Sequence, residues 1–599
     1  MNAKADLKRL KLAANIGMVT IDGMVINSAQ PEDPPAARTE VRDDGVYYIG
    51  TKIDSEDGSV IELPPLWLCD RLEIIGRGID ESRESYRALR WHSRGSHQEQ
   101  TLALNLGMVG ERLSWSVLRR GGLAIGTSRR PLEFLASWLQ TGGDDLMHSI
   151  SHRGGWNLGA YVLPSGEVIG EPSGPLFYNG DRSHAHAFQP HGSVEGWRDG
   201  VAKLCSGNSR PMLAIGAAMG ASLLHLVGLE SGGFHFYGPS GCGKTTSANV
   251  GASVWGHPHE QVLNWDATAL ALANAAAARN DGLMLLDEIG QGNPEAVSMA
   301  AYRLFNGTGK MQGAREGGNR EMLRWRVLVL STGEVDLTSV MQGGGRRTRA
   351  GQEVRLASLP ADAGFGMGCF ERLNGQTDSN RLAKALDKAT QEHYGAAGRA
   401  VVAYIAERRE AVAIQLKAAI NAAMDDLPSE ASGQVRRVAA RFAVAGEALE
   451  IATEAGLTGW RVKEGCNAVR RCFSAWLDRY GLGNREDEQI ISQAEGWFSA
   501  HAYSRFIDWH DLSKDRKQKV FNLAGYRRND GHELFFLVNP AVFVDEIAEG
   551  FDKTAAADVL ARVGMLQKAG DGKSTGTHRT PDWPDPRRFY KFVRTNRTE

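Results

Sequence analysis

Short apolar runs that end in polar residues recur through the middle of the chain. Residues 234–237, 283–286 and 327–330 have the length and composition of buried strands. Helical patterns separate these runs, so strands and helices alternate over about 194–359. This alternation predicts a parallel sheet with helices on its faces.

The N-terminal part has a different pattern. Residues 28–44 are proline-rich and charged, as in a linker, and residues 45–109 contain short alternating runs separated by Gly, Asp and Ser. This second pattern predicts a β-rich region, followed by helices at 111–120 and 131–140. A hairpin that turns at Pro164–Gly166 is expected next.

A phosphate-binding loop follows the first apolar run. The residues GPSGCGKT match G-x-x-x-x-G-K-[ST], with an expected strand before the motif and a helix after it. Glycines let backbone N–H groups close around phosphates, and the N-terminus of the helix adds partial positive charge. Lys244 is expected to reach the β- and γ-phosphates of ATP, and Thr245 to bind Mg²⁺. The expected nucleotide-binding residues are Gly238, Pro239, Ser240, Gly241, Cys242, Gly243, Lys244, Thr245 and Thr246.

Two carboxylates, Asp287 and Glu288, follow the second apolar run. The chain between the loop and this pair has room for a helix, a strand at 262–265 and a helix at 268–279. Asp287 is expected to hold Mg²⁺ through water, and Glu288 to polarise the attacking water. This assignment favours a hydrolase over a kinase.

The third run ends in Ser331 and Thr332. AAA+ ATPases sense the γ-phosphate with a polar residue at this point, and either side chain is a candidate. AAA+ rings also place an arginine beyond this strand, where its charge reaches the nucleotide of the neighbouring subunit. The candidates are Arg346, Arg347, Arg349 and Arg355, and for each of them a surface loop with no partner is the alternative.

Two cationic segments are candidates for DNA binding. The first is a hairpin before the third run, with its tip predicted at 316–319, whose cations would neutralise the phosphates of a single strand in a central pore. The second is a basic hairpin that follows a predicted helix at 553–566. This pair resembles a winged helix, a module that binds duplex DNA or protein. The residues are Lys310, Arg315, Arg320 and Arg324 in the first segment and Lys573, Arg579, Arg587 and Arg588 in the second. A solvated charged surface is the alternative for both.

Composition narrows these expectations. The formal net charge of the 599 residues is −2, so nucleic-acid contacts must come from local patches. The six cysteines form no C-x-x-C pair, which argues against structural zinc and fits a reducing cytoplasm. Residues 211–229 are apolar and nearly long enough to span a membrane, but they include Ser222 and His225. They predict a buried helix, and no membrane partner is expected.

Taken in order, GGWNLGAYVLPSGEVIG, the phosphate loop, LLDEIGQ, YRLFNGTGK, LSTGE and AGQEVRL resemble the domain-of-unknown-function family nine-hundred-and-twenty-seven of phages, plasmids and mobile cassettes. The similarity covers roughly residues 45–363. Members are helicase-like ATPases, and some cassette members are described as self-loading hexameric replicative helicases related to the minichromosome-maintenance type. The resemblance implies these roles for Lys244, Thr245, Asp287, Glu288 and the hairpin at 310–324. It identifies no single arginine that acts in trans.

The expected fold class is α/β: a P-loop NTPase of AAA+ type, with a parallel sheet flanked by helices, a β-rich N-terminal domain and a helical, winged-helix-like C-terminal region. The expected parts are a tail and linker at 1–44, the β-rich domain at 45–193, the ATPase core at 194–375, a helical domain at 376–511 and the winged-helix-like domain at 512–599.

The expected function is that of an ATP-dependent, ring-forming DNA translocase or helicase. We expect a replicative hexamer from a phage or other mobile element, using ATP and Mg²⁺ on single-stranded DNA, with duplex DNA as a second contact of the C-terminal domain. Two alternatives stay open: an ATP-driven signalling or defence switch, and a replication initiator or loader that does not unwind DNA.

Overall fold

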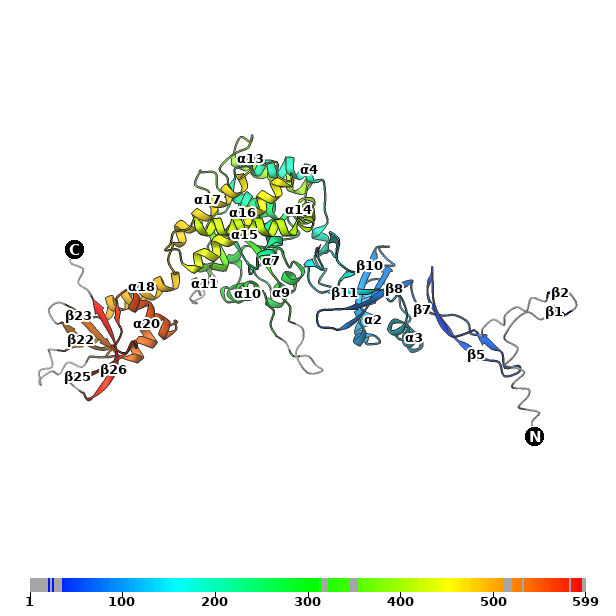
Figure 1. The fold of residues 1–599 in the computed structure, drawn as a ribbon, viewed down its shortest axis with the longest axis horizontal. Helices are drawn as coiled ribbons and strands as arrows, with labels where there is room; N and C mark the ends of the chain where they lie inside the picture. Colours follow the sequence, from blue (N-terminus) through cyan, green and yellow to red (C-terminus); the bar gives the residue numbers. More distant parts are fainter. Residues whose placement is uncertain are drawn as a thin grey trace. The chain divides into compact units, whose positions relative to one another are not determined.

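The computed structural model describes residues 20–21, 24–25, 35–311, 313, 322–343, 354–509, 520–529, 533–580 and 583–594. The chain folds into two compact units, Met1–Ile150 and Ser151–Glu599 (Figure 1). The finer domain boundaries expected from the sequence stay predictions.

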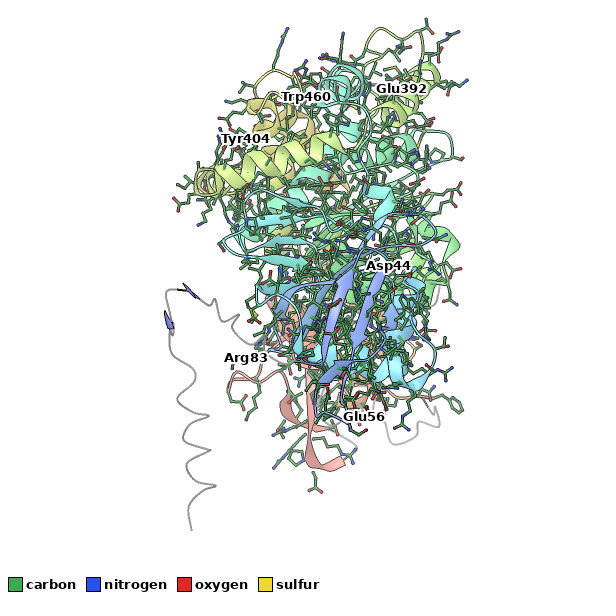
Figure 2. The ribbon with its side chains drawn as sticks, turned by 90° about the vertical axis from the view of Figure 1, so that its right-hand side faces the viewer. Asp44, Glu56, Arg83, Glu392, Tyr404 and Trp460 are labelled. Carbon is green, nitrogen blue, oxygen red and sulfur yellow. The ribbon has the colours of Figure 1, made fainter. Side chains whose placement is uncertain are left out.

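The first unit consists mainly of antiparallel strands. Its elements are β1 (Thr20–Ile21), β2 (Met24–Val25), β3 (Arg38–Arg42), β4 (Gly45–Ile49), β5 (Thr51–Ile53), β6 (Val60–Glu62), β7 (Leu66–Cys69), β8 (Leu72–Ile79), β9 (Ser85–His92), β10 (Glu99–Asn105), η1 (Leu106–Met108), α2 (Arg112–Arg120), α3 (Arg129–Thr141) and β11 (Met147–Ser151). In its largest sheet β9 lies between β8 and β10, and β11 runs parallel to β8. Arg83, with φ +64°, lies in the turn between β8 and β9 (Figure 2). The predicted β-rich N-terminal region is confirmed.

Five parallel strands form the central sheet of the second unit. Their order is β17 (Leu263–Asn264), β18 (Gly282–Asp287), β19 (Val327–Gly333), β16 (Gly232–Tyr237) and β20 (Leu356–Pro360). The predicted parallel sheet is therefore confirmed. Side chains alternate between its faces, with Leu283 and Leu285 in one core and Met284 and Leu286 in the other. Because all strands run the same way, their carboxyl ends share one edge.

Helices cover both faces of this sheet, and further helices pack against those helices. They are η2 (Ala185–Phe188), α4 (Val194–Trp197), η3 (Arg198–Ala202), α5 (Lys203–Cys205), α6 (Ser209–Gly220), η4 (Ala221–Leu223), α7 (Leu224–Val227), α8 (Lys244–Ala252), α9 (Ala269–Ala278), η5 (Ile289–Gln291), α10 (Pro294–Asn306), α11 (Leu337–Gly343), α13 (Ser379–Glu392), α14 (Ala396–Glu407), α15 (Arg409–Asp425), α16 (Gly433–Glu454) and α17 (Glu464–Tyr480). In the described part of the chain one helical run, Ser209–Val227, is long and apolar enough to cross a membrane, but 83% of its apolar window is buried inside the protein. This burial agrees with the core helix predicted there.

A small antiparallel sheet packs beside the parallel one. It contains β12 (Gly155–Asn157), β13 (Ala160–Val162) and β14 (Val168–Ile169), and β15 (Leu176–Tyr178) follows it. β13 pairs with β14, as the predicted hairpin requires. The Tyr161 hydroxyl donates to the Asp281 carbonyl at 2.9 Å, and the Trp156 indole N–H donates to the Ser222 carbonyl at 2.8 Å. These bonds attach the small sheet to the end of α9 and to the buried α6–α7 run.

The C-terminal part has a sheet and core of its own. Its elements are α18 (Arg485–His501), β21 (Phe506–Asp508), β22 (Gly525–Asn529), β23 (Leu534–Val538), α19 (Pro540–Val542), η6 (Phe543–Ile547), α20 (Lys553–Arg562), β24 (Leu566–Gln567), β25 (Gly576–Thr580) and β26 (Trp583–Arg594). The helix predicted at 553–566 is wrong at its end. It stops at Arg562 because Gly564 turns the chain with φ +77°, and Leu566 belongs to a strand.

Candidate functional site

The phosphate loop joins β16 to α8. It begins where β16 meets β19, with the Gly238 N–H donating to the Gly333 carbonyl at 3.2 Å. Gly241 and Gly243 have φ values of +78° and +93°, which residues with a Cβ rarely adopt. α8 starts directly after them, at Lys244. The strand–loop–helix context that the motif requires is therefore present.

Lys244 lies against this loop. Its Nζ donates to the carbonyls of Gly238 and Pro239, at 2.8 Å in both cases. Thr245 is exposed and Thr246 is half-buried in the first turn of α8. The first N–H groups of a helix have no partner within the helix and carry partial positive charge. Together with the ammonium group, they form a site suited to an anion such as phosphate.

The acidic pair lies at the carboxyl end of β18. Asp287 is half-buried, whereas Glu288 is exposed and has φ +52°, a value that is uncommon outside glycine and is concentrated at functional sites. In the neighbouring strand β19, the Thr332 hydroxyl donates a short hydrogen bond to Asp287 Oδ1. Because β19 separates β16 from β18, Thr332 lies at the sheet edge between the phosphate loop and the acidic pair.

Ser331 has a different environment from Thr332. Its Oγ accepts from the Trp265 indole N–H at 2.9 Å and lies 3.0 Å from His235 Nδ1, while His235 Nε2 lies 2.9 Å from the Val335 carbonyl. Because a carbonyl can only accept, Nε2 carries the proton and Nδ1 accepts from Ser331. Burial lowers the pKa of His235 to about 4, so the ring is neutral near pH 7. Ser331 thus belongs to a buried network, which the sequence reasoning missed. The alternation of side chains along a strand could have revealed it, because it places Ser331 on the same buried face as Val327 and Val329.

The polar groups at this edge fit ATP with Mg²⁺. Asp287 and Thr245 offer a carboxylate and a hydroxyl oxygen to a divalent cation. Across the described residues, no group of three or more His, Cys, Asp or Glu is placed to hold a metal ion. Mg²⁺ commonly takes one or two protein ligands and completes its shell with phosphate oxygens and water. The exposed carboxylate of Glu288 is chemically able to accept a proton from water.

The structure separates Arg355 from the phosphate loop. Arg355 precedes β20, at the amino end of the parallel strands, whereas the loop lies at their carboxyl end. Its Nη1 donates to Asn306 Oδ1 at 2.5 Å, and Nη2 lies 3.8 Å from Glu230 Oε2. Arg355 therefore lies away from the loop of its own subunit. The other arginine candidates, Arg346, Arg347 and Arg349, lie outside the described residues.

The base of the predicted basic hairpin is present. Thr308 and Arg324 form an antiparallel bridge, and the Gly309 N–H donates to the Leu323 carbonyl at 2.8 Å. Lys310 and Arg324 are both exposed. The predicted tip, with Arg315 and Arg320, lies outside the described residues.

The C-terminal cations lie on exposed parts of β25, β26 and the turn before them. Arg587 and Arg588 are consecutive on β26, so they point to opposite faces of the sheet, and they pair with His578 and Thr577 respectively. Lys573 forms an ion pair with Asp571 at 2.8 Å, and Arg579 is exposed. These cations do not converge on one face.

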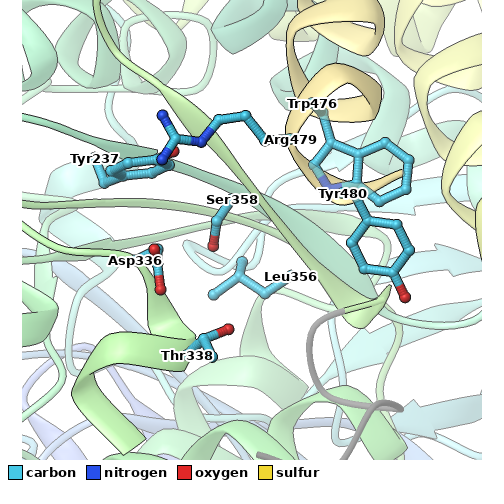
Figure 3. Close-up of a pocket in the computed structure, with 8 residues that line it drawn as sticks. All are labelled: Tyr237, Asp336, Thr338, Leu356, Ser358, Trp476, Arg479 and Tyr480. Carbon is cyan, nitrogen blue, oxygen red and sulfur yellow. The ribbon is translucent and has the colours of Figure 1, made fainter. Parts of the chain in front are cut away.

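A pocket next to the end of β16 was not expected from the sequence (Figure 3). The Arg479 guanidinium of α17 lies 5.2 Å from the centre of the Tyr237 ring, near Asp336. Trp476 and Tyr480 stack at 4.6 Å in its wall. The pocket holds about 120 Å³, below the about 300 Å³ typical of small-molecule sites. The pocket is therefore too small for a nucleotide. Its lining residues instead pack α17 against the ends of the parallel strands.

Comparison with known proteins identifies two similarities. Residues 39–324 match the family described as Domain of unknown function (DUF927). Among solved structures, the chain is similar to a protein described as "SCCmec type IV Cch - active helicase", with a TM-score of 0.66 and 17% sequence identity over 93% of this chain and 97% of that chain. No curated protein sequence matches. At this identity the structural likeness shows a shared fold.

Proposed function

We propose that this chain, whose residues 39–324 match the DUF927 family, is an AAA+ ATPase that moves along DNA as a ring. The observation that carries the proposal is the arrangement at one sheet edge, where Thr332 contacts Asp287 between the phosphate loop and Glu288. The structural relative is described as an active helicase, which supports the same activity here. We infer a replicative role in a phage or other mobile element.

Each group at this edge has one proposed task. Lys244 and the backbone N–H groups of residues 238–245 bind the β- and γ-phosphates of ATP. Thr245 and Asp287 hold Mg²⁺, which when bound neutralises the charge that develops on the phosphates. Thr332 orients the Asp287 carboxylate. Glu288 accepts the proton of the attacking water, so the product is ADP and phosphate.

The proposed ring supplies an arginine, which the phosphate loop at residues 238–245 does not contain. Arg355 lies at the opposite edge of the sheet from its own phosphate loop, where it is more suited to a neighbouring subunit. Arg346, Arg347 and Arg349 are the further candidates. An arginine in trans stabilises the transferring phosphoryl group and makes hydrolysis depend on assembly, which we propose to be hexameric.

The proposed DNA contacts are cations that bind the phosphate backbone. The hairpin that begins near Lys310 and returns at Arg324 leaves the sheet just before β19. Movement of β19 during the ATP cycle would therefore be transmitted directly to this hairpin. The C-terminal region, which we propose to be winged-helix-like, offers duplex DNA the cations of β25 and β26.

ATPase measurements with and without single-stranded DNA test this proposal. Wild-type protein is expected to be stimulated by DNA. Changing Lys310 or Arg315 to Ala is expected to reduce the stimulation and to lower the slope of log affinity against log salt by about 0.7 per lost phosphate contact, the value for single strands. Lys384→Ala, an exposed lysine of α13, is the matched control and should leave both quantities unchanged.

The alternatives give different results in the same assay. ATP hydrolysis that ignores all DNA would favour the signalling or defence switch. Stimulation by duplex DNA alone, lost on truncation of the C-terminal region, would favour the initiator or loader. A protein that stays a single protomer with ATP and DNA in size-exclusion chromatography would contradict the ring.

A further inference from the structure

Two cysteines far apart in the sequence meet under the phosphate loop. Cys242 belongs to the loop, and Cys369 follows β20. The Cys369 N–H donates to the Cys242 carbonyl at 2.8 Å, so the two residues lie directly beside each other. Gly368 makes this approach possible, since a Cβ at that position would lie 2.3 Å from the Cys242 carbonyl oxygen.

The two thiols differ in access and charge. Cys369 is fully buried, whereas Cys242 is half-buried, and Lys244 Nζ lies 4.0 Å from Cys242 Sγ. The hydrogen bond from Cys369, with the nearby Lys244 ammonium, lowers the pKa of Cys242 to about 6. The same hydrogen bond, with burial, raises the pKa of Cys369. Cys242 is therefore the nucleophile of the pair and Cys369 the second thiol.

The other cysteines lack these properties. Burial raises the pKa of Cys69, Cys205 and Cys472, and it raises the pKa of Cys466 to about 12. Thiolates, not thiols, react with oxidants, so these four side chains are poor competitors. Oxidation should therefore be selective for the pair at the phosphate loop.

We propose that Cys242 and Cys369 form a reversible disulfide that switches off the nucleotide site, with a hydroperoxide as the oxidant. This inference rests on the proposed ATPase function for its consequence, although the disulfide itself does not. The pair is a modification site inside the nucleotide-binding loop, so the redox state of the thiols would control ATP use.

The chemistry balances in two steps. The Cys242 thiolate attacks one oxygen of hydrogen peroxide, the O–O bond breaks, and the products are a sulfenic acid and hydroxide, which takes up a proton to become water. The Cys369 sulfur then attacks the sulfenic sulfur, forming the S–S bond and releasing a second water. Two thiols are oxidised by two electrons, and one hydroperoxide is reduced. A dithiol such as dithiothreitol reverses the reaction by exchange.

The disulfide would distort the loop. The two sulfurs must approach to about 2.05 Å to be joined, which pulls Cys242 toward the buried segment after β20. Cys242 lies between Gly241 and Gly243, whose left-handed conformations shape the loop. A displacement of about 1 Å in a reacting site can cost about a hundredfold in rate. The oxidised protein should therefore hydrolyse ATP much more slowly.

Peptide mapping and ATPase assays test the switch on the full chain. Purified protein is treated with hydrogen peroxide and digested without reduction by trypsin and chymotrypsin, whose cleavage at Tyr237 separates Cys242 from Cys205. The expected result is a cross-linked Cys242–Cys369 peptide, a loss of ATPase activity of about a hundredfold, and recovery of both with dithiothreitol.

Variants make the test specific. Cys369→Ser should remove the cross-link, and its oxidised Cys242 should be trapped by dimedone as a sulfenic acid. Cys466→Ser, at the other half-buried cysteine, is the control and should behave as the wild type. No cross-link at full peroxide exposure would overturn the proposal, and so would a cross-link that leaves ATPase activity unchanged. If the reduced wild-type protein hydrolyses no ATP, the proposed function fails, whereas a mapped cross-link would still support the thiol pair.

Discussion

The phosphate-loop edge and the C-terminal sheet hold their polar groups in different ways. At the loop edge, backbone conformation and buried partners place each group: Gly243 turns the chain, Lys244 bonds to two loop carbonyls, and Thr332 bonds to Asp287. On β26, the cations Arg587 and Arg588 stand exposed on an antiparallel strand and point to opposite faces. The phosphate-loop edge therefore depends on the positions of its polar groups, whereas the C-terminal sheet offers mainly exposed positive charge.

This difference predicts how each region responds to substitution. A group positioned by buried hydrogen bonds acts through orientation, so a small change should have a large effect on rate. An exposed cation acts through screened Coulomb attraction, and its removal should have a small effect that depends on salt.

The largest effect is expected at Glu288. Glu288→Gln removes the proposed general base while keeping the size of the side chain, so turnover should fall by about 10²–10⁴-fold. ATP binding should persist, because the loop and Lys244 are untouched. Phosphate release measures the first quantity, and titration with a fluorescent ATP analogue measures the second.

A matched change at the next strand end controls for charge. Glu334→Gln alters an exposed carboxylate directly after β19, and it should leave turnover unchanged. Rapid hydrolysis by Glu288→Gln would remove Glu288 from the proposed mechanism.

The second largest effect is expected at Thr332 of β19, and it should differ in kind from the effect at the adjacent Ser331. Thr332→Val removes the hydroxyl that bonds to Asp287, and changes at groups that orient a metal ligand typically cost about 10–100-fold in affinity or activity. Ser331→Ala instead leaves the Trp265 N–H and His235 without their shared partner. The expected cost is about 1–3 kcal/mol of stability. Mg²⁺ titration of ATPase activity and urea unfolding measure the two effects.

The roles assigned to Thr332 and Ser331 are tested by comparing activity and stability in the two variants. If Thr332→Val lowers stability and keeps the Mg²⁺ response, while Ser331→Ala lowers activity at full stability, the two roles are exchanged. If both variants lose only stability, neither residue senses the nucleotide.

The buried His235 predicts a pH effect on stability. Burial lowers its folded pKa to about 4, below the ordinary 6.5, so between these values the unfolded chain binds a proton that the folded chain does not. The stabilisation is complete above pH 6.5 and is lost as the pH falls toward 4. From pH 6.5 to 5 the loss should be about 2 kcal/mol, at 1.36 kcal/mol per pKa unit. Urea unfolding at several pH values measures it.

His225 contributes in the same direction, since burial and the Arg409 guanidinium also lower its pKa to about 4. His235→Gln should therefore remove about half of the change in unfolding free energy with pH, and a double variant with His225→Gln should remove most of it. A slope that His235→Gln leaves intact would contradict the neutral buried ring.

The sequence could predict the loop edge because the local pattern contains its geometry. A strand, a glycine-rich turn and a helix start are consecutive in the chain, so the residues from Gly238 to Thr246 needed no distant contact. The same holds for the acidic pair after β18, and for the parallel sheet, which follows from alternating strands and helices. The helix end at Arg562 was misjudged because Gly564 stood inside an otherwise helical pattern.

Contacts between distant segments could not be predicted. Cys369 meets Cys242 only because β20 lies beside β16, and Arg479 reaches Tyr237 only because α17 packs against the strand ends. The choice between Ser331 and Thr332 depended on which face of β19 each occupies. Arg355 could be recognised as a cation near the end of the ATPase region, but its position at the amino end of the strands required the register of β20.

The smallest effect is expected on β26. Arg587 and Arg588 point to opposite faces, so one DNA molecule on one face should contact only one of them. Changing that arginine to Ala should lower the slope of log affinity against log salt by about 1, and changing the other should have no effect. Fluorescence anisotropy with a duplex oligonucleotide at several salt concentrations measures the slopes, and the matching Arg→Lys variants should retain them. Equal losses from both Ala variants would mean that charge density alone attracts DNA to this strand, whereas no loss from either would place duplex binding elsewhere.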